Sequence, residues 1–178
     1  MERYGIHSKE LNWFKSYLDD RKQRVTIRGT LSETEKIKFG VPQGSILGPI
    51  LFLLYINDLQ YASALMSILF ADDTTLTASN NDIKSLFQHT NFELEKVTDW
   101  FLANKLALHP AKCKFILFFP PNSSEIPTCQ IMGKDIERVY QSGKEKYFKY
   151  VGIHLDERLT FQSHIQNIEL KITKTWQL

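Results

Sequence analysis

Apolar residues recur along this chain with two spacings, one typical of helices and one typical of strands. The helical spacing is clearest over residues 82–104, where one face carries almost only apolar side chains. Asn81 or Asp82 is suited to cap the start of this helix. The predicted helices are residues 9–19, 49–60, 82–104 and 160–176, and the stripe of the third comprises Ile83, Leu86, Phe87, Thr90, Leu94, Val97 and Phe101.

Alternating apolar and polar residues predict strands in much of the remaining chain. Val25 with Ile27, and Ile37 with Phe39, predict a hairpin that turns around residues 29–32. Because helices and strands mix without a regular strand–helix–strand alternation, the predicted fold class is α+β. Further strands are expected at residues 67–71, 74–78, 114–119 and 147–153, with another hairpin around Gly133 and Lys134.

Composition and charge limit the possible classes of protein. The 178 residues are 43% hydrophobic and carry a net charge of +2, which is weak evidence for nucleic-acid binding. Two cysteines, Cys113 and Cys129, give no disulfide framework. The longest apolar run, Ile50 to Ile56, is too short to span a bilayer, and the N-terminus lacks an apolar signal core. We therefore expect an intracellular chain without a membrane-spanning segment.

Two adjacent carboxylates, Asp72 and Asp73, follow the apolar segment 67–71. The pattern of strand, tight turn and strand places both at the tip of a hairpin. An Asp pair in a turn is usually solvated, since Asp is a preferred turn residue. The preceding apolar run looks buried, however, and a divalent cation would neutralise the pair there. Because Mg2+ takes oxygen ligands together with substrate phosphates, the pair indicates a phosphoryl-transfer site.

A second informative segment, residues 40–49, is rich in glycine and proline. Its three glycines and two prolines exclude the interior of a regular helix or strand. Pro49 is favourable in the first turn of a helix, so a rigid loop leads into the buried helix predicted over residues 49–60. The loop is either purely structural, with glycines at positive φ, or it brings backbone close to a ligand, with Gln43 and Ser45 as polar groups.

Together, these segments resemble the reverse transcriptases of non-LTR retrotransposons of the LINE and jockey type. The glycine-rich loop and the following residues 51–59 resemble the family's motif B, and Phe70-Ala71-Asp72-Asp73 resembles its motif C. Three further blocks agree in order with the family. They lie within residues 4–23, which precede motif B, residues 100–114, which resemble motif D, and residues 150–165, which resemble motif E and the entry to the thumb.

The resemblance implies the palm of a right-hand polymerase, an antiparallel sheet backed by helices, with partial fingers and the start of the thumb. It divides the chain into residues 1–142, with motifs B, C and D, and residues 143–178, with the motif E strand and the thumb entry. The implied activity is RNA-directed DNA synthesis by two-metal nucleotidyl transfer. The implied partners are an RNA template, a DNA primer and deoxynucleoside triphosphates.

Site residues follow from the same resemblance. Asp72 and Asp73 would hold Mg2+ or Mn2+, and Lys112 would protonate the pyrophosphate leaving group. Gly152 and Ile153 would hold the primer strand through their backbone. A plain surface lysine and a strand that simply packs are the structural alternatives for these last three residues. The template base and the incoming nucleotide would lie against Gly40, Pro42, Gln43, Gly44, Ser45, Phe70 and Ala71.

One departure from the family pattern bears on the expected activity. In the family a further metal-binding Asp lies on the motif A strand, upstream of the block that resembles residues 4–6, and this sequence begins after that point. We therefore expect an inactive chain that is poorly soluble, since the sheet would lack a strand. One alternative is a non-catalytic retroelement remnant that at most binds nucleic acid. Another is an RNA-dependent RNA polymerase, which residues 42–44 and 70–73 disfavour by resemblance.

Overall fold

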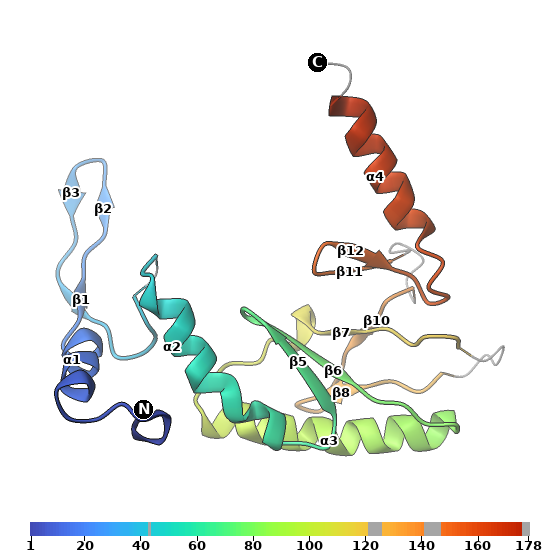
Figure 1. The fold of residues 1–178 in the computed structure, drawn as a ribbon, viewed down its shortest axis with the longest axis horizontal. Helices are drawn as coiled ribbons and strands as arrows, with labels where there is room; N and C mark the ends of the chain where they lie inside the picture. Colours follow the sequence, from blue (N-terminus) through green and yellow to red (C-terminus); the bar gives the residue numbers. More distant parts are fainter. Residues whose placement is uncertain (43, 121–125, 141–146, 176–178) are drawn as a thin grey trace. The chain divides into compact units, whose positions relative to one another are not determined.

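The computed structural model describes residues 1–42, 44–120, 126–140 and 147–175 (Figure 1). The chain divides into two compact units, residues 1–57 and residues 58–178, and each is described by itself. The boundary predicted between residues 142 and 143 lies outside the described residues and stays a prediction. None of the described helices has both the length and the apolar character needed to cross a membrane.

The first unit contains a helix, a long hairpin and a second helix. The helix predicted over residues 9–19 is confirmed, and so is the hairpin that follows it. The returning strand ends at Lys36, however, so Ile37 and Phe39 are not part of it; the Ile37 amide still donates to the Arg21 carbonyl. The elements are η1 Glu2–Tyr4, α1 Ser8–Leu18, β1 Lys22–Gln23 paired with β4 Glu35–Lys36, β2 Thr26–Ile27 paired with β3 Thr30–Leu31, and α2 Leu47–Ile56.

Helix α2 begins two residues before the proline that was expected to open it. Pro49 is the third residue of the helix, where its missing N–H would have no intrahelical acceptor. The expectation of a buried helix is correct for only part of its surface. Leu51 and Ile56 are buried, but Ile50 and Leu53 on other faces are about half exposed.

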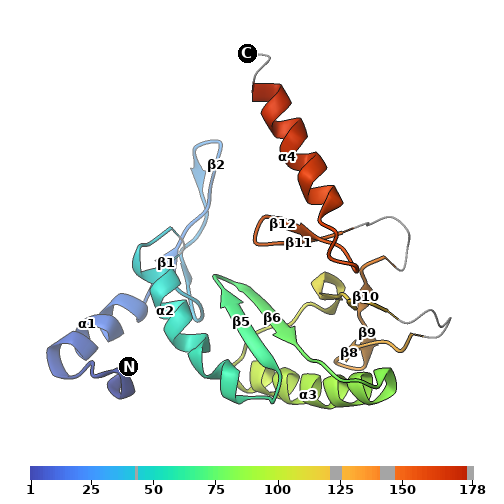
Figure 2. The same cartoon turned by 45° about the vertical axis from the view of Figure 1, so that its right-hand side comes forward.

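The second unit is built on one long helix that short strands cover (Figures 1 and 2). Its helix over residues 83–103 and the last helix agree with the prediction. The elements are η2 Asn57–Tyr61, which begins at the unit boundary, β5 Met66–Phe70, β6 Asp73–Thr77, α3 Ile83–Ala103, η3 Pro110–Lys112, β7 Lys114–Phe115, β8 Gln130–Ile131, β9 Lys134–Asp135, β10 Glu137–Arg138, β11 Phe148–Tyr150, β12 Ile153–Leu155 and α4 Gln162–Thr175.

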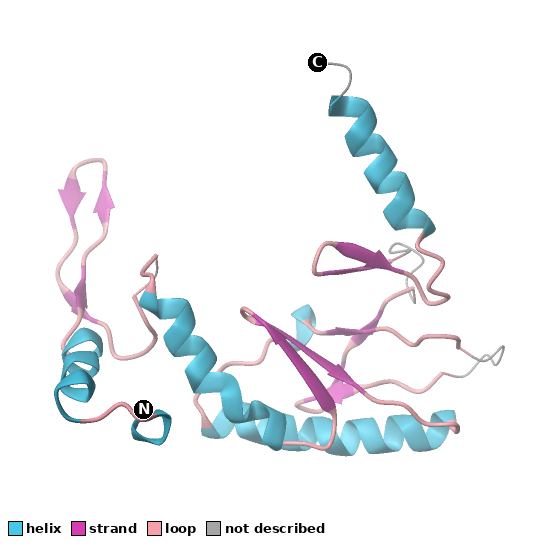
Figure 3. Ribbon diagram, in the orientation of Figure 1, coloured by secondary structure: helices cyan, strands magenta, loops and turns pink. Residues whose placement is uncertain are grey.

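Every sheet in the described part of the chain has two strands (Figure 3). Five of the six pairs are antiparallel and β7 pairs with β10 in parallel, so the mixed α+β class is confirmed. Two strand predictions are wrong in extent. The strand expected over 114–119 is only Lys114–Phe115, and the one expected over 147–153 reverses at Val151 and Gly152, both at positive φ, to form the β11–β12 hairpin.

The core of the second unit packs against the apolar stripe of α3. All seven predicted stripe residues are buried or half-buried, and the Asp82 side chain caps the helix by accepting the Ser85 amide at 2.7 Å. Phe87 meets Phe115 edge to face. The buried cluster comprises Leu65, Phe87, Leu94, Cys129, Ile131 and Ile136.

Two leucines of α3 offer a direct test of this core. Leu94 is 8% exposed and Leu102 is 56% exposed. We expect Leu94→Ala to lower the free energy of unfolding of the second unit by about 2–5 kcal/mol, since it leaves a cavity. The matched variant Leu102→Ala should change it by about 0.5 kcal/mol or less. Urea denaturation followed by circular dichroism measures both, and equal effects of the two variants would contradict the assigned core.

Candidate functional site

The two carboxylates lie where the sequence predicted them, at the tip of a hairpin. Strands β5 and β6 pair from Met66 opposite Thr77 to Phe70 opposite Asp73. Ala71 and Asp72 form the two-residue turn, with Ala71 in the left-handed region at φ 53°. This register brings Phe70, Ala71, Asp72 and Asp73 together at one end of the hairpin.

The tip is open to solvent. Asp72 and Asp73 are both exposed. The apolar run before them is not buried as expected, because alternate residues of a strand face opposite sides. Met66, Ile68 and Phe70 form one exposed face, while Leu76 of β6 packs against the core around α3. The base of the hairpin lies over α3 and its tip projects away from the helix (Figure 2).

A buried carboxylate on α3 holds the base of this hairpin. Glu93 is 2% exposed, and it accepts the backbone N–H of Ala64 at 2.6 Å, just before β5 begins. It also accepts a hydrogen bond from the Lys96 ammonium at 2.7 Å. The Lys96 bond, with that from Ala64, holds the pKa of Glu93 below its ordinary value. Our sequence predictions did not include Glu93, although a glutamate between Thr90 and Val97 on an apolar stripe was a visible signal.

The glycine-rich loop lies in the first unit and is stabilised by hydrogen bonds between its own residues. Gly40 and Gly44 have φ of 81° and 75°, a region that favours glycine. The Ser45 hydroxyl donates to the Pro42 carbonyl at 2.7 Å and accepts the Gly48 amide at 3.0 Å. A Cβ on Gly48 would lie 2.9 Å from that hydroxyl oxygen and 3.1 Å from the Pro42 carbonyl oxygen, so a larger residue there would require the loop to shift. The expected polar group Gln43 lies outside the described residues.

Arg21 ties this loop to the preceding helix. Its guanidinium donates through Nε to the Leu18 carbonyl at 3.1 Å and through a second nitrogen to the Gly40 carbonyl. These bonds satisfy a carbonyl of the last turn of α1 and fix the start of the loop. Arg21 therefore stabilises the start of the loop from within the first unit. Its place in the basic run of residues 21–24 did not predict this role.

The remaining predicted site residues lie on the surface of the second unit. Lys112 ends the short helix η3 with an exposed side chain. Gly152 lies in the turn between β11 and β12, at φ 89°, and Ile153 begins β12 with 42% exposure. The backbone at Gly152 is therefore a turn rather than the continuous strand that was expected.

Metal ligands are only partly assembled in the part of the chain that the structure describes. Asp72 and Asp73 are adjacent, but no group of three or more His, Cys, Asp or Glu side chains there could hold a metal ion. The loop at residues 40–49 and the carboxylate tip belong to different compact units. The expectation that residues of both lie against the same template base and incoming nucleotide thus stays a prediction.

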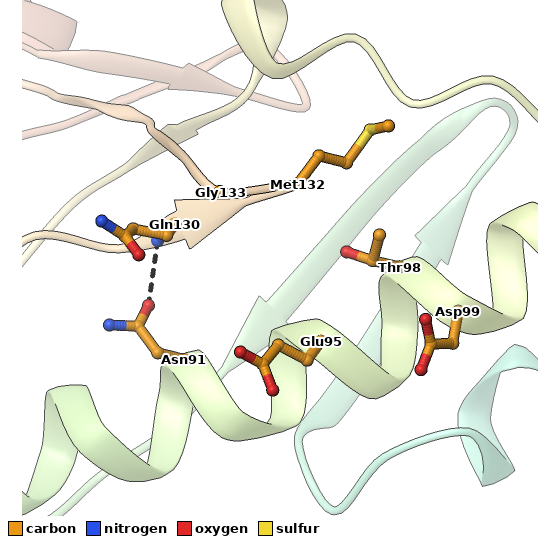
Figure 4. A pocket seen from close by; sticks show the side chains of 7 residues that line it. All are labelled: Asn91, Glu95, Thr98, Asp99, Gln130, Met132 and Gly133. Carbon is orange, nitrogen blue, oxygen red and sulfur yellow. Dashed lines mark hydrogen bonds between the residues drawn. The ribbon is translucent and has the colours of Figure 1, made fainter.

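A shallow hollow lies where α3 meets the β8–β9 hairpin (Figure 4). Asn91 bridges the two elements. Its side-chain oxygen accepts a hydrogen bond from the backbone N–H of Gln130 at 2.9 Å, and its side-chain nitrogen donates to the Thr128 carbonyl at 3.0 Å. These bonds dock β8 onto the helix. The hollow is lined by Asn91, Glu95, Thr98, Asp99, Gln130, Met132 and Gly133.

Comparison with known proteins identifies the family. Residues 1–155 match the model of the family "Reverse transcriptase (RNA-dependent DNA polymerase)". The chain belongs to the reverse transcriptase family. This confirms the family that the glycine-rich loop and the Asp72–Asp73 tip indicated by resemblance. No solved structure matches the chain.

Similar reverse transcriptases come from insect mobile elements. The RNA-directed DNA polymerase from mobile element jockey of Drosophila melanogaster is 29% identical over 163 residues, which are 87% of this chain and 17% of that protein. The probable RNA-directed DNA polymerase from transposon BS of the same fly is 30% identical over 164 residues, 85% of this chain and 17% of that protein. The chain thus spans about one-sixth of the length of these curated relatives.

The turn at the tip of this reverse transcriptase hairpin gives one prediction. Ala71 adopts a left-handed backbone at φ 53°, which disfavours side chains branched at Cβ. We expect Ala71→Val to lower the free energy of unfolding by about 1 kcal/mol or more, and Ala71→Gly to leave it equal or higher. Thermal unfolding distinguishes the two substitutions. A valine variant as stable as the glycine variant would contradict the assigned turn.

The Glu93 contact predicts a dependence of stability on pH. Because its folded pKa lies below the ordinary value, Glu93 stabilises the fold at neutral pH, and this contribution is lost as the pH falls through the acid range of glutamate. Glu93→Gln should therefore be destabilised relative to wild type at pH 7, and the difference should shrink toward pH 3. Urea denaturation across this range measures the difference. A difference that stays constant with pH would contradict the buried ionised pair.

Proposed function

We propose that this chain supplies the motif C carboxylates of an RNA-directed DNA polymerase from a non-LTR mobile element. The observation that carries the proposal is the tip of the β5–β6 hairpin. There Asp72 and Asp73 stand side by side, with Phe70 directly opposite Asp73. Membership of the reverse transcriptase family supports the assignment of this tip to metal-dependent nucleotidyl transfer.

The donor set suits a hard divalent cation. Mg2+ and Mn2+ take carboxylate oxygens together with water and phosphate oxygens, and an exposed pair leaves room for a nucleotide beside it. When bound, two such cations would activate the primer 3′-hydroxyl and stabilise the leaving pyrophosphate. Asp72 would be the direct ligand and Asp73 the supporting one. Further ligands would have to come from outside this pair, because two side chains cannot complete two coordination shells.

We assign the other predicted residues the roles that the family resemblance implies. Phe70 and Ala71 would lie near the primer terminus, where a small side chain at position 71 leaves room for the sugar. Lys112, with its exposed ammonium, would protonate the leaving pyrophosphate. Gly152 and Ile153 would hold the primer strand at the β11–β12 turn. Gly40, Pro42, Gln43, Gly44 and Ser45 would lie against the template base and the incoming nucleotide.

The proposal extends to the fold and the partners. The β5–β6 hairpin on α3 would be the centre of a polymerase palm, and residues 143–178 would lead into the thumb. An RNA template, a DNA primer and deoxynucleoside triphosphates would be the partners, inside the cell. Two observations support nucleic acid as a partner. The family is RNA-dependent by description, and the exposed side of the hairpin carries Phe70 beside the carboxylates.

Manganese binding tests the carboxylate assignment directly. We expect wild-type protein to bind Mn2+ weakly, and Asp72→Asn and Asp73→Asn to lose at least about tenfold in affinity, since each removes a charged ligand. Asp58→Asn, at another exposed aspartate, is the matched control and should bind like wild type. Electron paramagnetic resonance of free Mn2+ measures the affinity. An equal Mn2+ affinity of Asp72→Asn and the wild type would exclude a metal site at this carboxylate.

Primer extension separates the catalytic proposal from its alternative. We expect residues 1–178 alone to give little or no templated synthesis with Mg2+, because two carboxylates furnish only part of a two-metal site. Robust synthesis would contradict this. Nucleic-acid binding that falls steeply with salt and is unchanged in Asp72→Asn would instead favour a non-catalytic binding role.

A further inference from the structure

Glu93 is a charged side chain in a position that otherwise suits an apolar one. It lies on the core-facing side of α3, next to the buried Leu94 and one turn before Val97. Burying a carboxylate is unfavourable unless it is paired and hydrogen-bonded. Here both of its oxygens have a partner, since Oε2 accepts the Ala64 amide and Oε1 accepts the Lys96 ammonium.

The Ala64 contact lies at the start of the hairpin that ends in the two aspartates. Ala64 precedes the buried Leu65, which packs with Phe87 and Leu94, so a polar and an apolar contact fix the same point. The hydrogen bond to a charged acceptor is stronger than one between neutral groups. Lys96 is itself held, because its ammonium lies 4.4 Å from the centre of the Phe92 ring.

A fixed base matters because the hairpin acts as a lever. At about 3.3 Å per residue, the eight steps along the chain from Ala64 to Asp72 place the tip roughly 20 Å or more from the anchor. A rotation of about 5° at the base then moves the carboxylates by about 2 Å over that length. Metal and substrate sites tolerate displacements of only about 0.5 Å.

We infer that Glu93 is a positioning residue, whose hydrogen bond to Ala64 and ion pair with Lys96 set the angle at which the β5–β6 hairpin leaves α3. The placement of Asp72 and Asp73 relative to the nucleotide and the other ligands that complete the metal site depends on that angle, and this part of the inference rests on the proposed function. Glu93 touches neither the metal nor the substrate. Its effect reaches them through the hairpin.

Two substitutions at position 93 separate the contributions of the contact. Glu93→Gln keeps an acceptor for the Ala64 amide but loses the charge, and Glu93→Met keeps the volume but loses both bonds. Glu95→Gln is the control, because Glu95 is exposed on the same helix, two residues away. Circular dichroism confirms that each variant is folded, and the conservative Gln variant carries the test if the Met variant does not fold.

The decisive measurement is the orientation of the hairpin. Pulsed electron paramagnetic resonance measures the tip-to-helix distance between two spin labels. One label is attached at Ala71→Cys on the tip and the other at Leu102→Cys on α3, in a background with Cys113→Ser and Cys129→Ala. We expect the width of the distance distribution to grow about twofold in Glu93→Gln and further in Glu93→Met. Glu95→Gln should match the parent. A parent-like distribution in both Glu93 variants would overturn the inference.

Manganese affinity without spin labels tests the functional half. With a deoxynucleoside triphosphate present to supply phosphate ligands that do not move with the hairpin, Glu93→Gln should bind Mn2+ about three- to tenfold more weakly than wild type, with Glu95→Gln unchanged. If wild-type binding does not depend on Asp72, the proposed function fails, while the distance measurement still decides whether Glu93 orients the hairpin. The opposing result is that Glu93→Gln broadens the distance distribution while its Mn2+ affinity stays equal to that of the wild type and dependent on Asp72. That result would leave Glu93 a structural role only and overturn its role in positioning the carboxylates.

Discussion

The packing of one apolar stripe on α3 is the constraint on which the second unit depends. Phe87 and Leu94 of that stripe contact residues from the strands before and after the helix, including Leu65 and Ile131. The strands do not form a stable sheet by themselves, since each pairs with only one neighbour in the described residues and an isolated two-stranded sheet is marginally stable. Burial against α3 therefore holds the β5–β6 hairpin and the segments around β7 and β8 on this helix, which positions the carboxylate hairpin.

The base of the β5–β6 hairpin is anchored, and its tip is exposed. The inner face of the hairpin contributes Leu76 to the core, and its base is held at Ala64 by Glu93. The outer face and the tip remain open, with Phe70 and the two aspartates exposed. A rigid base with an exposed tip is the arrangement that a metal- and substrate-binding site requires. In the first unit, Arg21 and the Ser45 hydroxyl brace the glycine-rich loop in a comparable way.

Local patterns predicted the elements well but predicted burial and pairing less well. Each of three features depends on residues that are close in sequence. The α3 stripe follows from helical periodicity, the Asp82 cap from capping preference, and the Asp72–Asp73 tip from turn chemistry. The exposure of Ile50 on α2 and the reversal of the chain at Gly152 depend on which surfaces meet, and sequence spacing does not contain that information. Glu93 was missed because a buried charge is explained by a partner, Ala64, that lies 29 residues away.

We propose that Asp72 and Asp73 hold a divalent metal beside a nucleotide. The most direct measurement is a crystal structure of the protein with primer–template, a deoxynucleoside triphosphate and Mn2+, in which anomalous scattering locates the metal. We expect an anomalous peak bound to the Asp72 carboxylate and to the triphosphate, with Asp73 beside it. A peak bound to other residues, with both aspartates in solvent, would contradict it.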